Sequence, residues 1–350
     1  MTQYADIFMR DFVGDTGQIP STTRTTVSQS PDIIPAGTTP VANYQTYYAN
    51  NYYGPINSYN YYHNLQQQNY NYIYLRADNL YPGAQTGQVY LYYCPSSLLL
   101  LPDQWINNRI PCSNAHNYAN FTATTTNQIV VGDAPFYWLP PPLSSSQGHY
   151  CLIAQVVTSE DPNPIPSGDD LHDFALWVAD HPGIAWRNVT VINTVPPPGY
   201  SGYQTIANPH ANHEIYVLLV TCLEIPDGTV VSLVCPVEGP APAINLVETV
   251  GPANQMTSDP KSNLFSTTSR LPGNFVAQVQ LTAQTPAGAQ LPFGASITVS
   301  CLLAASSSSK AAHVGFRPEE IGLDASVLGD EAESGVLLLL GDYTYRYAID

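Results

Sequence analysis

The chain has few charged side chains, and positive ones are the scarcest. Only 11% of its 350 residues are charged, against roughly 25% in an average protein, and 10 Lys and Arg face 27 Asp and Glu. The formal net charge is -17, and the two lysines are Lys261 and Lys310. Binding to nucleic acid or anionic lipid needs clustered Lys or Arg. We therefore expect no nucleic-acid partner.

Long hydrophobic runs are also missing. No window of about 20 apolar residues could form a membrane span, and residues 1–6 lack the basic region and apolar core of a signal peptide. The chain therefore stays inside the cell, leaves it by a non-classical route, or has lost a leader. We expect an extracellular or cell-surface location, and the cytoplasm stays open as the alternative.

Complete catalytic motifs are absent as well. The sequence holds no Gly-x-Ser-x-Gly elbow, no phosphate-binding glycine loop and no Cys-x-x-Cys zinc spacing. Most of the six cysteines lie in apolar, strand-like runs, where a free thiol behaves as a small hydrophobe. Cys94 with Cys112 is the most plausible disulfide if the protein is exported. We expect a protein without enzymatic activity and without a cofactor, calcium excepted as described below.

Short runs of β-forming residues fill most of the chain. The 31 prolines and 23 glycines are spread along it and disfavour long helices, while 44% of residues are hydrophobic. Turn-separated runs of Val, Ile, Tyr and Phe predict antiparallel strands. The predicted strands are residues 72–77, 88–94, 127–131, 134–138, 149–157, 186–192, 214–220, 229–234, 274–281 and 295–302. This pattern predicts an all-β protein with two tandem immunoglobulin-like β-sandwiches.

Domain boundaries follow from shifts in composition. Residues 1–40 read as an extended N-terminal arm over the first module, and residues 41–180 as the first sandwich with a tyrosine-rich segment. An Asp- and Pro-rich loop and one helical turn at 174–180 end it. Residues 181–305 predict the second sandwich. Residues 306–350, after a serine-rich hinge, predict a C-terminal arm with two β-prone runs.

Two segments are candidates for contacts with partners. Val336, Leu337, Leu338, Leu339 and Leu340 form an apolar run that must pair with this chain's own sheet or with a neighbour's. The tyrosine-rich segment contains Tyr47, Tyr48, Tyr52, Tyr53, Tyr61 and Tyr62. Tyrosines suit protein interfaces, sugar stacking or subunit packing. The alternative is that these rings cover the first module's own core.

An acidic loop is the candidate metal site. Asp169, Asp170 and Asp173 cluster beside a Gly- and Pro-containing loop, and Asp161 could join them. Calcium takes several carboxylate oxygens at once, so this loop either binds calcium or is plain solvated acidity.

Two further motifs resemble fragments of catalytic sites. Asp15-Thr16-Gly17 spells the aspartic-protease triplet, but it occurs once, and a solvated turn is the simpler interpretation. His210, His213 and Glu214 follow a proline into a strand, whereas a zinc hydrolase needs both histidines on one helix face. We expect an ordinary loop there.

Three stretches together resemble a known group of proteins. They are residues 6–11 with 15–17 and 30–33, then 148–154 leading to Asp161-Pro162, then 184–189. They resemble uncharacterised bacterial multi-domain proteins with tandem CARDB-like or immunoglobulin-like modules. The resemblance implies repeated β-sandwiches of cell-surface, secreted or protease-associated proteins, and it implies no reaction. The tyrosine-rich insertion and Pro35 depart from that pattern.

The sequence favours a non-catalytic structural protein that self-associates into a filament, sheath, lattice or surface assembly. Low charge density reduces repulsion between packed copies, and terminal arms could add strands to a neighbour's sheet. The alternative is an adhesive module that binds a glycan or a protein surface, and a secreted effector or toxin component is a third class.

Overall fold

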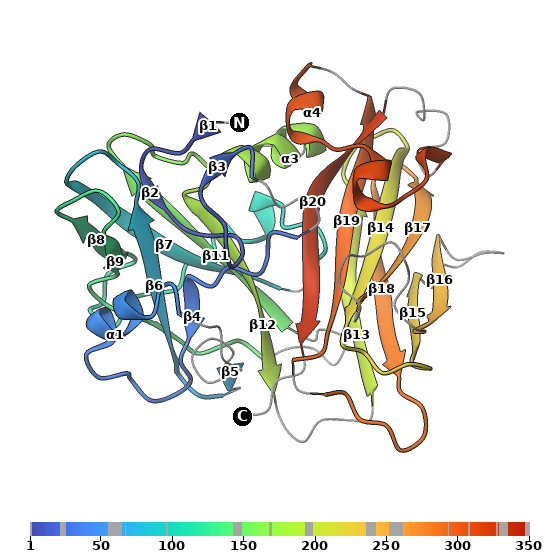
Figure 1. Ribbon diagram of the computed structural model, residues 1–350, viewed down its shortest axis with the longest axis horizontal. Coiled ribbons are helices and arrows are strands. Elements are labelled where there is room, and N and C mark those ends of the chain that lie inside the picture. The colour runs from blue at the N-terminus through green and yellow to red at the C-terminus, as the bar shows by residue number, and fades with distance from the viewer. Residues whose placement is uncertain are drawn as a thin grey trace.

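The computed structural model confirms the all-β class (Figure 1). It describes residues 2–21, 26–54, 65–66, 68–95, 97–142, 149–167, 170–192, 199–235, 243–251, 262–292, 294–306, 309–326, 328 and 335–346. The longest helix, α3, has 10 residues. Within these ranges, no helix has the length and apolar character needed to cross a membrane.

Residues up to 192 build two five-stranded sheets and a small two-stranded one. β6 is the centre of the first, where it pairs with β2, β4, β9 and β10, and the second has the order β5-β12-β11-β7-β8. The strands are β1 (Thr2–Gln3), β2 (Ile7–Phe8), β3 (Gln18–Ile19), β4 (Ile33–Pro35), β5 (Leu65–Gln66), β6 (Asn71–Asn79), β7 (Gln85–Pro95), β8 (Ala119–Ala123), β9 (Ile129–Val131), β10 (Phe136–Trp138), β11 (His149–Thr158) and β12 (Ile184–Ile192).

The rest of the chain builds two four-stranded sheets, ordered β13-β18-β15-β16 and β17-β14-β19-β20. Their strands are β13 (Gly199–Asn208), β14 (Glu214–Leu223), β15 (Val230–Cys235), β16 (Ile244–Thr249), β17 (Ser262–Leu271), β18 (Phe275–Gln284), β19 (Ser296–Ser306) and β20 (Gly335–Arg346). The helical elements are α1 (Tyr44–Asn50), η1 (Pro102–Gln104), α3 (Leu171–Asp180), α4 (Ser309–Val314) and η2 (Pro318–Ile321).

β11, in the middle of the second sheet, is buried on both faces, which explains its nearly continuous apolar sequence. One face of this sheet, with Leu91 and Leu152, packs against the β6 sheet. The other, with Tyr92 and Ile153, belongs to a hydrophobic cluster that continues through α3 into both sheets of the second half. The two halves therefore share one continuous core.

One predicted strand joins a sheet other than the one expected, and the C-terminal runs pair with this chain's own sheet, which was one of their two alternatives. The run at 186–192, expected to open the second module, is β12 and pairs with β11 from His149↔Thr190 to Gln155↔Ile184. The two C-terminal runs form a single strand, β20, that pairs with β19 along its whole length. An alternating sequence marks a strand but not the sheet that it enters, so long-range pairing decided both.

The N-terminal arm lies over the first half, as Figure 1 shows for the blue segment. Its β2 and β4 pair with β6. Further on, Gln29 bridges to Arg187 on β12, and Ser28 contacts Asp342 on β20. The arm thus joins both halves of the molecule.

Candidate functional site

A buried ion network lies under the tyrosine-rich segment. Asp32 accepts hydrogen bonds from the Arg10 Nη2 at 2.6 Å and from the Arg76 Nε at 2.9 Å, and all three side chains are almost fully buried. Burial alone would raise the pKa of Asp32, but the charges and hydrogen bonds of Arg10 and Arg76 outweigh it and hold that pKa below its usual value. The carboxylate stays ionised between its two partners.

This network holds α1 against the β6 sheet. The Arg76 Nη1 donates to the carbonyl oxygens of Tyr48 and Asn51, at 3.1 and 3.2 Å. The Arg10 guanidinium lies 3.5 Å from the centre of the Tyr52 ring and also donates to the Tyr52 carbonyl oxygen. The two guanidinium groups therefore donate hydrogen bonds to carbonyl oxygens at the C-terminal end of α1. A seven-residue helix would have little stability without such contacts.

The tyrosines predicted as interface residues divide into two groups. Tyr48 and Tyr52 are 3% exposed and pack inward, as the core-covering alternative expected. Tyr47 is 37% exposed and Tyr53 79%, so these two rings face solvent. Tyr61 and Tyr62 lie outside the described residues.

Three rings that the sequence analysis did not select lie together at the β6 sheet: Tyr70 is exposed, and Tyr72 and Tyr137 are half-buried. Tyr70, 49% exposed, stacks on Tyr137 with ring centres 4.4 Å apart and planes 9° apart, and Tyr72 lies 4.9 Å from Tyr137. Period-two alternation in β6 puts Tyr72 and Tyr74 on one face, which was a usable signal. The register Tyr137↔Tyr72 depends on long-range pairing and could not be read from the sequence.

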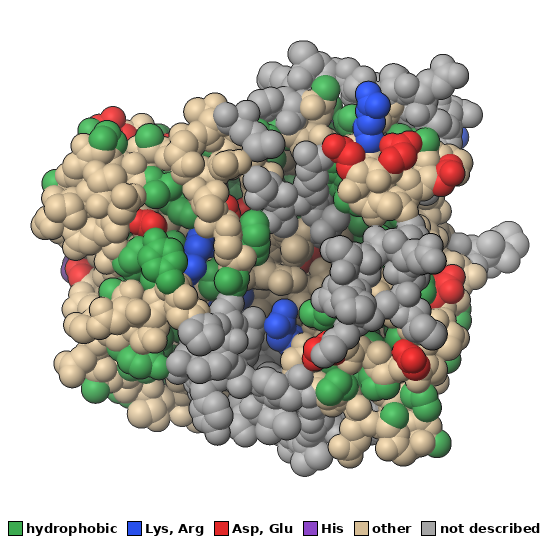
Figure 2. Space-filling model, viewed as in Figure 1, with side chains coloured by type: hydrophobic (Ala, Val, Ile, Leu, Met, Phe, Trp, Pro, Cys, Tyr) green, Lys and Arg blue, Asp and Glu red, His purple; other side chains and the backbone are tan. Residues whose placement is uncertain are grey.

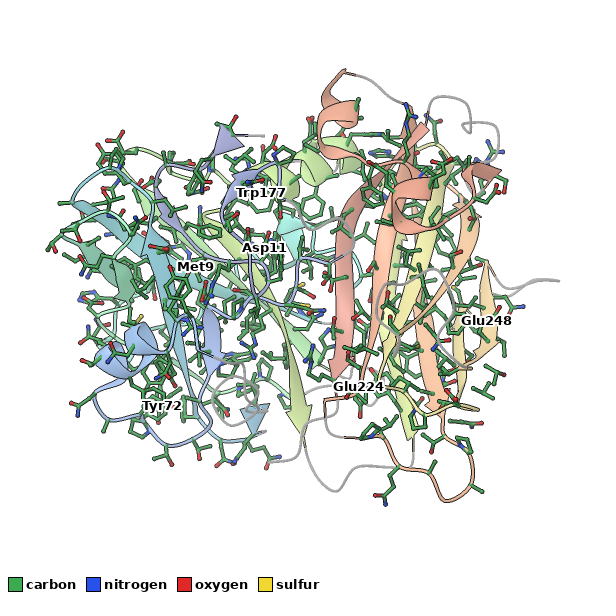
Figure 3. The ribbon with its side chains drawn as sticks, viewed as in Figure 1. Met9, Asp11, Tyr72, Trp177, Glu224 and Glu248 are labelled. Atoms are coloured by element: carbon green, nitrogen blue, oxygen red, sulfur yellow. The ribbon has the colours of Figure 1, made fainter. Side chains whose placement is uncertain are left out.

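We call Tyr47, Tyr53, Tyr70, Tyr72 and Tyr137 the tyrosine surface. In Figure 2 hydrophobic side chains, tyrosine included, gather on the left half of the molecule, where Figure 1 places α1 and β6. Figure 3 labels Tyr72 in this region. The surface combines ring area with hydroxyl groups, and the buried network fixes the backbone next to Tyr47 and Tyr53.

The C-terminal apolar run is not exposed to a partner. Val336, Leu337, Leu338 and Leu340 are at most 6% exposed and Leu339 is partly buried, because β20 is bonded to β19 and covered on both faces. The register shifts opposite Cys301 and Leu302, near Gly341. A Cβ at Gly341 would lie 2.4 Å from the Leu98 carbonyl oxygen, so this close approach requires glycine.

Of the predicted calcium residues that the structure describes, Asp170 and Asp173 lie at the start of α3. Asp170 caps α3, and its Oδ1 accepts from the backbone amides of His172 and Asp173. Asp161 accepts from the Tyr4 hydroxyl and the Asn163 amide. Asp169 lies outside the described residues. Elsewhere in the described chain, no three His, Cys, Asp or Glu side chains form a group that could hold a metal ion.

The protease-like triplet directly follows a turn at Val13 and Gly14, and the carboxylate of Asp15 is buried and not solvated. Asp15 accepts hydrogen bonds from the backbone amides of Asp11 and Gly17 and is 9% exposed. Burial is the main reason that the pKa of Asp15 is raised. Burial followed by the charge of Asp15 raises the pKa of Asp11 well above its usual value. The Asp15 carboxylate therefore stabilises the local backbone through its two hydrogen bonds.

The histidine-rich loop ties the two halves together. The His210 Nδ1 lies 2.8 Å from the Glu214 Oε1, and its Nε2 accepts from the Leu171 amide at 3.2 Å, at the start of α3. The acceptor role of Nε2 places the proton on Nδ1. His210 therefore orients α3 on the second half.

One buried triad resembles a catalytic set in composition only. The Cys151 Sγ lies 3.6 Å from the His149 Nε2 and 2.7 Å from the Asn188 Oδ1. Burial raises the pKa of the Cys151 thiol and lowers that of His149 to about 3. A nucleophilic thiolate with an imidazolium needs the opposite shifts. The geometry and burial indicate a packed core.

Cys94 faces Cys151 and not Cys112. Cys94 and Cys151 are register partners on β7 and β11 and share one core cluster, whereas Cys112 belongs to the cluster on the other face of that sheet. The predicted Cys94–Cys112 disulfide is therefore wrong, because the sheet separates the two side chains. All six cysteines are free and buried.

Comparison with known proteins gives no relative from which a function could be inferred for this chain. No protein-family model matches the chain, and no curated protein matches it. The resemblance to bacterial CARDB-like or immunoglobulin-like modules stays a prediction from the motifs that carry it.

Proposed function

We propose that this protein is a non-catalytic structural protein that self-associates, and that the tyrosine surface is one of its contacts. The observation that carries this proposal is the set of exposed tyrosines over α1 and β6, with Tyr53 79% and Tyr70 49% exposed. Tyrosine is enriched in the cores of protein interfaces, and a large exposed ring patch on a soluble protein indicates a binding surface.

Rigidity supports the same function. The carbonyls of Tyr48, Asn51 and Tyr52 are bound to buried guanidinium groups, so the backbone that carries Tyr47 and Tyr53 is already ordered. Tyr70 and Tyr137 order each other by stacking. A preorganised surface loses less conformational entropy when it docks, which favours association.

Serine substitution of the exposed rings tests this proposal. Tyr47→Ser, Tyr53→Ser and Tyr70→Ser in one variant remove ring area without altering the buried Asp32 network. We expect light scattering and electron microscopy to show smaller species than the wild type forms. The matched variant carries phenylalanine at the three positions and should retain association. If both variants match the wild type in size, the tyrosine surface is not a contact.

A glycan-binding adhesive module is the second candidate. The Tyr70 and Tyr137 stack, with planes 9° apart, offers a flat ring on which the C–H face of a neutral sugar could stack. A glycan array distinguishes the two: an adhesive module binds a glycan as a monomer, whereas a structural protein grows in size without any glycan.

A further inference from the structure

The outer face of the β13-β18-β15-β16 sheet carries no charged side chain among the described residues. Every second residue of 276–284 on β18 points outward, together with its register partners on the neighbouring strands. These are Ser, Thr, Gln, Asn, Ala, Gly, Tyr and Val. We call this set the sheet face. The chain as a whole has a net charge of -17.

Burial fixes which way each row points. Val279, Leu281 and Leu233 are fully buried and face the core. Val276 and Val247, in the opposite row, are 70% and 60% exposed. Val276 is on β18 and Val247 is on β16, with β15 between them, and no part of the described chain covers either side chain.

Cross-strand hydrogen bonds hold the polar side chains of the sheet face in place. The Gln278 Nε2 donates to the Thr205 Oγ1 at 2.8 Å, and the Ser232 and Thr282 hydroxyls are 2.6 Å apart. Side chains that are already bonded to one another lose little entropy on contact, so the face is prepared for a flat partner.

The charge nearest in register points away from the sheet face. Glu248 on β16 pairs with Val231, which belongs to the inward row, and Glu248 is exposed at the sheet margin. Figure 3 labels it at the right edge of the molecule. The acidic side chain therefore borders this surface without lying on it.

We propose that the sheet face is the contact between two copies of this chain, packed face to face about a two-fold axis. This proposal rests on the proposed self-association and names a contact distinct from the tyrosine surface. Two copies of an acidic chain repel wherever carboxylates meet, and an uncharged face is where that repulsion is least. Gln, Thr and Val side chains from stacked sheets interdigitate in dry interfaces.

A two-fold contact pairs identical surfaces. Because the tyrosine surface lies on the other half of the chain, each copy would have two separate contacts. A chain with two contacts can join more than one neighbour, which an extended assembly needs.

Charge insertion tests the proposal. Val247→Glu with Val276→Glu puts two carboxylates on each copy at the proposed contact, outside the core. We expect the dissociation constant of the pair, measured by sedimentation equilibrium, to rise at least about tenfold, because like charges would face each other. Val13→Glu is the matched control, since Val13 is exposed (51%) but lies in the N-terminal arm. Val247→Thr with Val276→Thr keeps the face uncharged and should associate like the wild type.

The outcomes separate this proposal from the function on which it rests. If the double glutamate variant associates more weakly than the wild type and the Val13→Glu variant, and circular dichroism shows all three folded, the sheet face is one of the contacts. If the double glutamate variant associates as tightly as the wild type, the sheet face is not a contact, although self-association stands. If the wild type is monomeric throughout, both proposals fail.

Discussion

The carboxylate of Asp342, near the end of β20, accepts a 2.9 Å hydrogen bond from the backbone amide of Ser28 in the N-terminal arm. The Val27 amide and the Thr26 hydroxyl donate to the same carboxylate, at 2.7 and 2.8 Å. One buried side chain thus joins both ends of the chain. The sequence left open whether the arms contact this chain or a neighbour, and here they are bonded to each other.

Removal of this acceptor should destabilise the fold. Asp342→Ala leaves the buried amides of Val27 and Ser28 unpaired, and we expect a loss of about 1–3 kcal/mol in the free energy of unfolding. Asp342→Asn keeps one acceptor and should cost less. Urea denaturation measures both, with Asp324→Asn, on an exposed turn, as the control. Equal stability of the alanine variant and the control would contradict the role of Asp342.

The buried acid Asp11 should make the protein less stable as pH rises. Its folded-state pKa is raised by burial and then by the charge of Asp15, so the native chain holds this proton more tightly than the unfolded chain. Its contribution is fully present below the unfolded pKa of about 3.9 and is lost as pH rises through the folded pKa. Thermal denaturation of the wild type and of Asp11→Asn should be compared across this pH range. As pH rises, the wild type should lose stability relative to the variant, because Asn does not titrate. A constant difference would contradict this assignment.

Asp32 should show the opposite pH dependence. Its folded-state pKa is lowered by Arg10 and Arg76 against the effect of burial, so its contribution is present above the unfolded pKa and is lost as pH falls through the folded pKa. Asp32→Ala leaves two buried guanidinium groups uncompensated, and we expect a loss of about 3–5 kcal/mol. Limited proteolysis should then cut within α1, which the network anchors. Intact α1 in a folded variant would contradict that anchoring.

The thiols should be unreactive in the native protein. Burial raises the pKa of every cysteine, including that of Cys112 to about 12 and that of Cys222 to about 12. A colorimetric thiol reagent at mildly alkaline pH should therefore label the native chain slowly and all six cysteines after denaturation. Rapid labelling of Cys151 in the native state would point to an accessible thiolate and would revive a catalytic interpretation of its contacts with His149 and Asn188.

Strand positions could be predicted from the sequence because period-two alternation is a local signal. The run at 149–157 is β11, and the run at 295–302 is β19. β13 and β17 were missed, since their glycine, serine and threonine content weakens the apolar alternation. The helix at 174–180 begins three residues earlier because the Asp170 side chain caps it.

Pairing partners and buried polar contacts could not be predicted in the same way. The Asp32 network joins residues 22 and 44 positions apart, and the Ser28–Asp342 contact spans 314 positions. No local pattern encodes such distances. The tyrosine-rich composition did draw attention to the correct segment, but only packing decides that Tyr48 is buried and Tyr53 exposed.

Sedimentation equilibrium of the wild-type chain over a wide concentration series tests self-association most directly. If the chain self-associates, the average mass rises with concentration above that of one chain and rises further when salt screens the acidic surface. A mass equal to one chain at every concentration and salt level would contradict self-association.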